Sequence, residues 1–195
     1  YPAKPAQNGI QRLSGANRYA TAAAIAARVT NAADQADTIF IASGELYADG
    51  LTISALAAYS GSPMLLVQPT MVPAVTKTQL RALNPQRIVV AGGHGALSDS
   101  VLDNLSRTLP EAQIERIAGE DRYTTAALIA ERFPAGSPTF LATGRNFPDA
   151  LAAAAAASKL GGPVLLTPGF RSDSATHESV RNLQPNAVYL VGGQW

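Results

Sequence analysis

The sequence of 195 residues contains no cysteine and only two histidines. The absence of cysteine excludes a disulfide framework, a zinc–thiolate site and a cysteine nucleophile. Neither His94 nor His177 has a second ligand at metal-binding spacing, so the pattern predicts no metal site. A P-loop and a G-x-S-x-G nucleophile elbow are also missing, and we therefore predict no catalytic residue.

Charge and long apolar runs are scarce as well. Charged residues make up 15% of the chain and the formal net charge is +1, which excludes a polybasic arm but permits local clusters of arginine. No apolar run approaches the roughly 18 residues that span a bilayer. We therefore expect no nucleic-acid partner and no membrane insertion. The hydrophobic content of 47% is instead typical of a folded globular chain.

The sequence does contain one pattern that occurs twice. RLSGANRYATAAAIA begins at Arg12, and RIAGEDRYTTAALIA begins 104 residues later at Arg116. Two further pairs of blocks follow in the same order, 100 residues apart: FIASGELYADG with FLATGRNFPDA, and LNPQRIVVAGG with LQPNAVYLVGG. Three aligned blocks in the same order indicate an internal duplication. The first copy covers residues 10–94 and the second 114–195, with a helix and linker at 95–113 between them.

Short apolar runs rich in β-branched residues alternate with helical stretches in both copies. Continuous apolarity is typical of strands that are covered on both faces. The expected strands are 38–41, 64–67, 87–90, 139–141, 164–166 and 188–191, and the expected helices include 19–29, 51–59, 75–83 and 101–109. This order predicts an α/β fold of two tandem repeats, each a small, mainly parallel sheet flanked by helices in Rossmann- or toprim-like layers.

The loop after the first strand of each copy carries the first candidate site residues. In parallel sheets, ligand groups gather at the carboxyl ends of the strands. Gly44 and Gly144 would let the backbone turn sharply or approach a ligand closely. Asp49 and Asp149 follow where a helix begins. Each aspartate either caps that helix or is a functional carboxylate that orients a nearby arginine.

Arginines at the start of the first helix of each copy are the next candidates. Arg18 and Arg122 lie where the helix dipole disfavours a cation. Each therefore needs a compensating group, which is either an internal carboxylate or an anionic ligand drawn to the same helix terminus. The sequence leaves both interpretations open. Arg12 and Arg116, six residues earlier, are placed to join the same basic cluster.

An enzyme is the alternative to a binding module. Residues 92–95 (GGHG) follow a strand, but the string lacks the third glycine of G-x-G-x-x-G, so we expect a tight turn and no cofactor. Equivalent aspartates in two copies indicate two like sites, and like sites favour avidity over catalysis. A nucleotide- or sugar-phosphate-processing enzyme with a site between the repeats stays open as the alternative. A purely structural or adhesive repeat is a third interpretation.

The repeated motifs resemble the cell wall binding repeat 2 family. They are R-L-S-G-A-N-R-Y and R-I-A-G-E-D-R-Y, the strands ending in S-G and T-G, P-M-L-L and P-V-L-L, and V-A-G-G (V-x-G-G) with L-V-G-G. The resemblance implies a secreted, non-catalytic module at the surface of Gram-positive bacteria that binds an anionic secondary cell-wall polymer non-covalently. It also implies three repeats about a pseudo-threefold axis. We therefore expect either a third repeat outside this chain or a homo-oligomer such as a trimer.

The resemblance further implies that a Pro-x-Leu-Leu motif takes part in polymer binding, together with nearby basic residues. The motif residues in this sequence are Pro63, Leu65, Leu66, Pro163, Leu165 and Leu166. Because Leu65 and Leu66 lie in an apolar run, their side chains fit the core better than a ligand contact. The loop that follows, with Gln68, is the expected contact instead.

Overall fold

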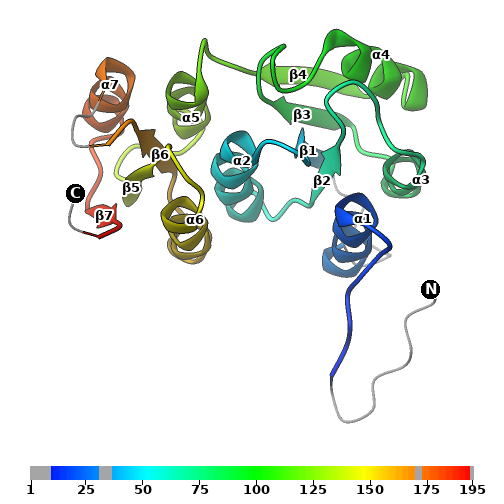
Figure 1. Ribbon diagram of the computed structural model, residues 1–195, viewed down its shortest axis with the longest axis horizontal. Helices are drawn as coiled ribbons and strands as arrows, with labels where there is room; N and C mark the ends of the chain where they lie inside the picture. The colour runs from blue at the N-terminus through cyan, green and yellow to red at the C-terminus, as the bar shows by residue number, and fades with distance from the viewer. Residues whose placement is uncertain (1–9, 31–36, 170–172, 194–195) are drawn as a thin grey trace.

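The structure is a computed structural model that describes residues 10–30, 37–169 and 173–193. Helices and strands alternate along these residues (Figure 1). The first unit, residues 10–117, contains α1 (Arg18–Val29), β1 (Thr38–Ser43), α2 (Tyr47–Tyr59), β2 (Met64–Val67), α3 (Ala74–Leu83), β3 (Arg87–Ala91), α4 (Asp99–Thr108) and β4 (Gln113–Ile117). The second unit contains α5 (Arg122–Ala130), β5 (Thr139–Thr143), α6 (Pro148–Leu160), β6 (Val164–Thr167), α7 (Ser174–Leu183) and β7 (Val188–Val191).

Each unit is built on one small sheet. The strand order is β2-β1-β3-β4 in the first sheet and β6-β5-β7 in the second, and every recorded strand pair is parallel. The two sheets share a register, since Phe40 is opposite Met64 in the first and Phe140 is opposite Val164 in the second. The predicted fold class, two tandem α/β repeats with parallel sheets, is therefore confirmed.

Strand β4 was not expected from the sequence. Its residues, QIERI, alternate between polar and apolar, which is the pattern of a half-exposed strand, whereas the other strands are continuous apolar runs. β4 pairs with β3, so that Ile114 lies opposite Ile88 and Ile117 opposite Ala91. The opening motif of the second sequence copy thus supplies the edge strand of the first sheet.

The two units share one hydrophobic core. Figure 1 shows α2 between the first sheet and the helices α5 and α6, and α2 packs against both of these helices. Ile53 of α2 and Ile129 of α5 are fully buried in this core. Burying one such side chain stabilises the fold by about 1.5–3 kcal/mol. Helix α6 contributes mainly alanines, whose small side chains let it approach α2 closely.

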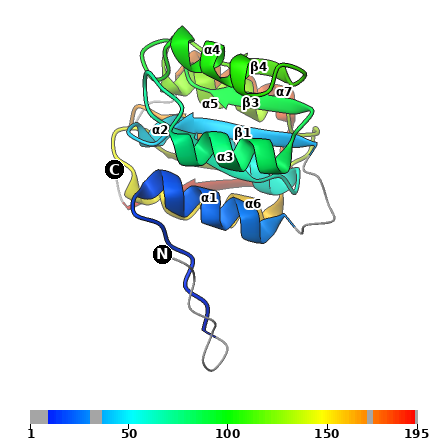
Figure 2. The ribbon, with the colours of Figure 1, turned by 90° about the vertical axis from the view of Figure 1, so that its right-hand side faces the viewer.

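A second core covers the other face of the first sheet. Ile39, Ile41, Ile88 and Val90 point to this side, where they pack with residues of α1, α3 and α4. In Figure 2, α1 and α3 lie in front of the strands of this sheet. With helices on both of its faces, the first sheet needs the continuous apolar strands that the sequence contains.

Candidate functional site

Both units build the same arrangement of arginine, tyrosine and glycine at the carboxyl end of the first strand. Arg122 donates a hydrogen bond of 2.6 Å to the carbonyl oxygen of Gly144, and Arg18 donates to the carbonyl oxygen of Gly44. A Cβ atom at Gly144 would lie 2.7 Å from Cε1 of Tyr123, and the tyrosine ring of the first unit lies equally close to Gly44. The two glycines are therefore needed for close packing of a tyrosine ring.

The start of the first helix in each unit is capped by a side chain. Asn17 accepts a hydrogen bond from the backbone of α1 at 3.0 Å, and Asp121 accepts from Tyr123 and Thr124 at 3.0 and 2.8 Å. Burial raises the pKa of Asp121, but hydrogen bonds from Thr124 and Tyr123 and the charge of Arg122 outweigh it and hold the pKa below its ordinary value. The second unit thus has an internal carboxylate near its arginine, whereas the first unit has a neutral cap.

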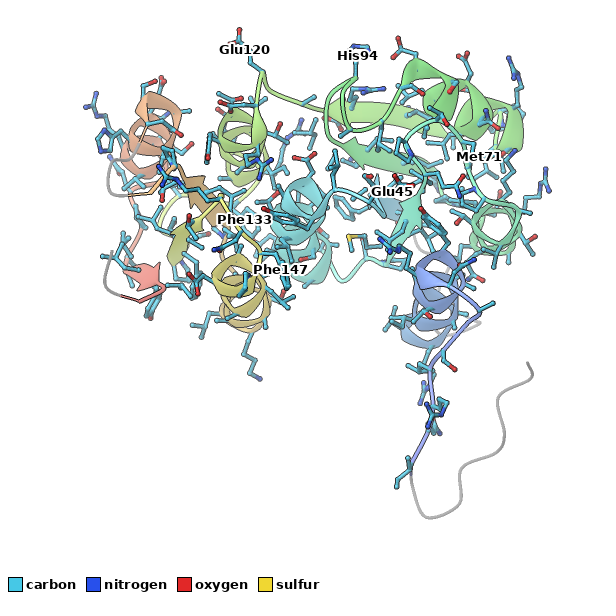
Figure 3. The ribbon with its side chains drawn as sticks, in the orientation of Figure 1. Glu45, Met71, His94, Glu120, Phe133 and Phe147 are labelled. Carbon is cyan, nitrogen blue, oxygen red and sulfur yellow. The ribbon has the colours of Figure 1, made fainter. Side chains whose placement is uncertain are left out.

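A cavity of about 190 Å³ lies next to the junction of the two units, and we call it the junction cavity. It is bordered by the start of α2, the turn between β3 and α4, and the loop between β4 and α5. Its lining includes Tyr47, Asp49, Gly93, Gly95, Gly119, Glu120, Asp121 and Arg122. In Figure 3, His94 and Glu120 project outward from the two loops that border the cavity.

Asp49 is the most deeply placed charged group of this cavity. Its residue is 8% exposed, no described residue donates a hydrogen bond to its carboxylate, and the carboxylate oxygens stay open to the cavity. Burial raises the pKa of Asp49, and the nearby charge of Arg122 offsets part of that effect. Gly92, at φ +112°, lies against the carboxylate, since a Cβ atom there would be 2.6 Å from Oδ2 of Asp49.

The interpretation of the two aspartates as helix caps is wrong. The N-cap of α2 is Leu46 and that of α6 is Phe147, and neither side chain makes a capping hydrogen bond. The helices begin earlier than the sequence indicated, which places Asp49 and Asp149 inside the first turn. Asp49 is buried there, whereas Asp149 is half-buried.

Tyr47 links the two units and was missed by the sequence reasoning. Its hydroxyl donates to the carbonyl oxygen of Arg145 at 3.2 Å and accepts from Arg122 at 3.3 Å. The Arg122 guanidinium lies 5.8 Å from the centre of the Tyr47 ring, a cation–π contact. Phe147, the equivalent residue of the second unit, packs edge-on at 5.9 Å. The sequence does contain a signal for this residue, because an aromatic side chain stands two positions before the aspartate in both copies.

Arg116 and Arg12 take no part in the two arginine–glycine contacts. Arg116 lies in β4, and its guanidinium donates to the carbonyl oxygens of Gly92 and Leu97 at 3.1 and 2.8 Å and pairs with Asp99 at 3.3 Å. It therefore holds the turn between β3 and α4. Arg12 is exposed and lies in the segment before α1.

The Pro-x-Leu-Leu residues lie mainly in the core. Pro63, Leu65, Pro163, Leu165 and Leu166 are buried, whereas Leu66 is half-buried. This matches the expectation that the leucine side chains serve packing. Gln68, half-buried in the loop after β2, donates its backbone N–H to the carbonyl oxygen of Met71 at 3.1 Å.

Comparison with known proteins identifies the family. The model of Cell wall binding domain 2 (CWB2) matches residues 12–102 and 116–194, which is most of the chain. The chain belongs to the cell wall binding domain 2 family. The resemblance seen in the repeated motifs is thereby confirmed, and the chain is a cell-wall-associated module. Within the described residues, no helix is both long and apolar enough to cross a membrane.

Two curated relatives come from Bacillus subtilis. The N-acetylmuramoyl-L-alanine amidase LytC is 31% identical over 192 residues, which cover 98% of this chain and 38% of that protein. An amidase enhancer is 31% identical over 156 residues, which cover 80% of this chain and 21% of that protein. This chain thus spans less than two-fifths of the length of either relative.

Solved structures of two Clostridium difficile proteins have the same fold. Cwp6 superposes with a TM-score of 0.82 at 27% identity, covering 91% of this chain and 28% of that one. Cwp8 superposes with a TM-score of 0.80 at 26% identity, covering 93% of this chain and 30% of that one. The two-unit arrangement described above therefore recurs in proteins that are much longer than this chain.

Proposed function

We propose that this chain is a non-catalytic module that holds a secreted protein on the cell wall by binding an anionic secondary wall polymer. The proposal rests on the guanidinium groups of Arg18 and Arg122. They lie at equivalent positions in the two units, each at the carboxyl edge of a sheet. Both side chains are anchored by a carbonyl oxygen, and in the described residues neither forms an ion pair. A guanidinium held in this way retains donors for a phosphate or carboxylate group.

Repetition favours binding over the alternative of one enzyme site between the repeats. Two like sites on a rigid body can contact one polymer chain at two places, and the second contact then forms at a high effective concentration. Modest affinity at each arginine is sufficient for tight retention. The family and the wall-associated relatives agree with this proposal, and the amidase activity named for LytC concerns that longer protein.

Sedimentation with purified Bacillus subtilis walls tests the proposal. The chain is mixed with walls before and after acid extraction of their secondary polymer, and the bound fraction is measured at several salt concentrations. We expect binding that disappears on extraction and weakens as salt rises, because salt screens exposed charges. Binding that survives extraction would show that the polymer is not the ligand.

A pair of double variants assigns the binding to the arginines. Arg18→Gln with Arg122→Gln should reduce wall retention strongly. The matched control, Arg81→Gln with Arg107→Gln, removes the same charge from exposed positions on α3 and α4. Equal retention of both double variants would mean that only the net charge of the chain matters.

We also propose that a third repeat of the same kind, outside this chain, packs against the second unit. Strand β7 is at the edge of its sheet (Figure 1), and Leu190 is 76% exposed where its equivalent, Val90, is fully buried. At the other end of the chain, Ile25 on α1 is 43% exposed where its equivalent on α5, Ile129, is fully buried. Ile129 is covered in the core that the two units share, whereas Val90 is covered by helices that follow or precede its own strand in the first unit.

Two measurements test this second proposal. Light scattering should give the mass of a single chain, 20.2 kDa; a multiple would show that copies of this chain cover the surfaces instead. The chain can also be extended by a second copy of its own residues 96–195, which continues the 100-residue register. Amide hydrogen exchange in β7 should then slow, and a Leu190→Asp substitution in the extended chain should restore fast exchange. Unchanged exchange on extension would refute the proposal.

A further inference from the structure

We propose that the junction cavity binds one pyranose unit of the wall glycan, and that the Asp49 carboxylate accepts hydrogen bonds from two neighbouring hydroxyl groups of that sugar. The inference rests on the proposed function and goes beyond it. It assigns a neutral part of the polymer to a site that exists once, at the junction, whereas the arginines take anionic groups at sites that exist in both units; Arg122 borders the cavity and the arginine site of the second unit.

The first argument is the state of the Asp49 carboxylate. Buried carboxylates in proteins are nearly always paired or hydrogen-bonded, because removal from water without a partner is costly. Asp49 is 8% exposed and lines the cavity, yet no described residue donates a hydrogen bond to it. Gly92 closes the space on one side of the carboxylate. The carboxylate oxygens are not fully enclosed, so a molecule in the cavity can replace water and supply the donors that this group needs.

The second argument concerns the charge of that molecule. An anion would face Asp49 together with Glu120 and Asp121, which also line the cavity. A cation would face Arg122, which is close enough to Asp49 to affect its ionisation. Within the described residues, no group of three or more side chains is arranged to hold a metal ion. A neutral molecule with hydroxyl donors satisfies the carboxylate without placing a charge beside Arg122 or beside the other two carboxylates.

The third argument concerns size and shape. A cavity of about 190 Å³ is smaller than the roughly 300–1,000 Å³ of pockets for drug-sized ligands, so it suits a single ring. Tyr47 adds an aromatic ring to its lining, and aromatic faces pack well against the apolar C–H groups of a sugar. Gly93 adds no side chain to its part of the wall, and the Gly119 carbonyl oxygen lies 3.7 Å from where a Cβ atom of Gly93 would lie.

Periodate oxidation of the ligand gives a sharp test. Periodate cleaves the carbon–carbon bond between two neighbouring hydroxyl-bearing carbons and leaves phosphodiesters intact. The probe is polymer released from Bacillus subtilis walls by acid, used intact and after oxidation. The binding affinities of the parent chain and of Asp49→Ala are measured for both forms by calorimetry.

We expect oxidation of the polymer and the Asp49→Ala substitution each to weaken binding on the order of tenfold, as for the loss of hydrogen bonds to a charged group. The two losses should not add, so that Asp49→Ala binds both forms of the polymer equally. Gly93→Met, which adds a side chain to the cavity wall and leaves Asp49 in the chain, should behave in the same way. Asp149→Ala, at the equivalent position of the second unit, should leave both affinities unchanged.

The outcomes separate this inference from the proposed function. Additive losses, or an Asp49→Ala chain that binds intact polymer as tightly as its parent, would overturn the sugar site and leave the arginine sites standing. A parent chain that binds neither form would overturn both. A thermal unfolding curve and Asp49→Asn, which keeps the shape of the side chain, show whether any lost binding comes from a lost fold.

Discussion

Replacement of Asp49 by asparagine should make the protein more stable. The carboxylate is buried, no described residue donates a hydrogen bond to it, and burial raises its pKa while Arg122 offsets only part of that effect. The folded state therefore disfavours the charged form. Asparagine has the same shape and no charge, so it avoids this penalty and keeps the packing of the helix start.

The pH dependence follows from the direction of the shift. Because the folded pKa lies above the unfolded one, the folded state binds the proton more tightly. The stability associated with protonated Asp49 is fully present below the unfolded pKa and is lost as the pH rises through the folded pKa. The penalty applies in full once the pH is above the folded pKa. Asp49→Asn should then gain on the order of 1 kcal/mol, which raises Tm by about 2–4 °C in a chain of this size.

Thermal unfolding followed by circular dichroism at pH 7 and near pH 4 measures this effect. The advantage of Asp49→Asn over the parent should shrink toward the lower pH, where the parent carboxyl is protonated. Asp149→Asn is the matched control, because Asp149 is half-buried at the equivalent place and its replacement should change Tm little. A lower Tm for Asp49→Asn at pH 7 would show that Arg122 stabilises the carboxylate more than burial destabilises it.

Three other substitutions test the packing. Gly144→Ala should cost about 1–3 kcal/mol in urea unfolding, because its Cβ atom would displace the Tyr123 ring, and an unchanged midpoint would disprove that contact. Arg116→Gln should lose buried hydrogen bonds worth about 1–3 kcal/mol and speed amide exchange in the turn before α4, whereas a change confined to wall binding would mean that its role is not structural. Leu165→Ala should cost about 2–5 kcal/mol and leave wall binding intact while the chain is folded; selective loss of binding would instead favour the motif as a contact.

The sequence predicted the elements that depend on local pattern. Six strands and the helices between them follow from apolar runs and their punctuation, and the structure places them within a few residues of the expected bounds. β4 was missed because one of its faces is only partly covered, so its residues alternate and fall below the signal of a buried strand. β4 also contains residues of the second sequence copy but pairs with β3 of the first copy, and the sequence repeat gives no sign of this pairing.

The sequence points to candidate residues only where their contacts are local. Arg18 and Gly44 meet within one unit, and so do Arg122 and Gly144, so both pairs could be found by comparing the two copies. The junction cavity is different, because Asp49 is buried by its place in the assembled fold. The sequence indicates that a helix begins near Asp49, but it does not indicate that the loop between β4 and α5 borders this helix start.

This difference separates two ways in which the module can bind. The arginine sites scale with the number of repeats, because each unit builds its own from residues close together in the fold. The junction cavity scales with the number of contacts between repeats, because Arg122 and the loop before it reach Asp49 only across a junction. Asp149 has no such neighbour among the described residues and is half-buried. A third repeat packed on α6 would therefore add an arginine site and also bury Asp149, which turns one sugar site into two.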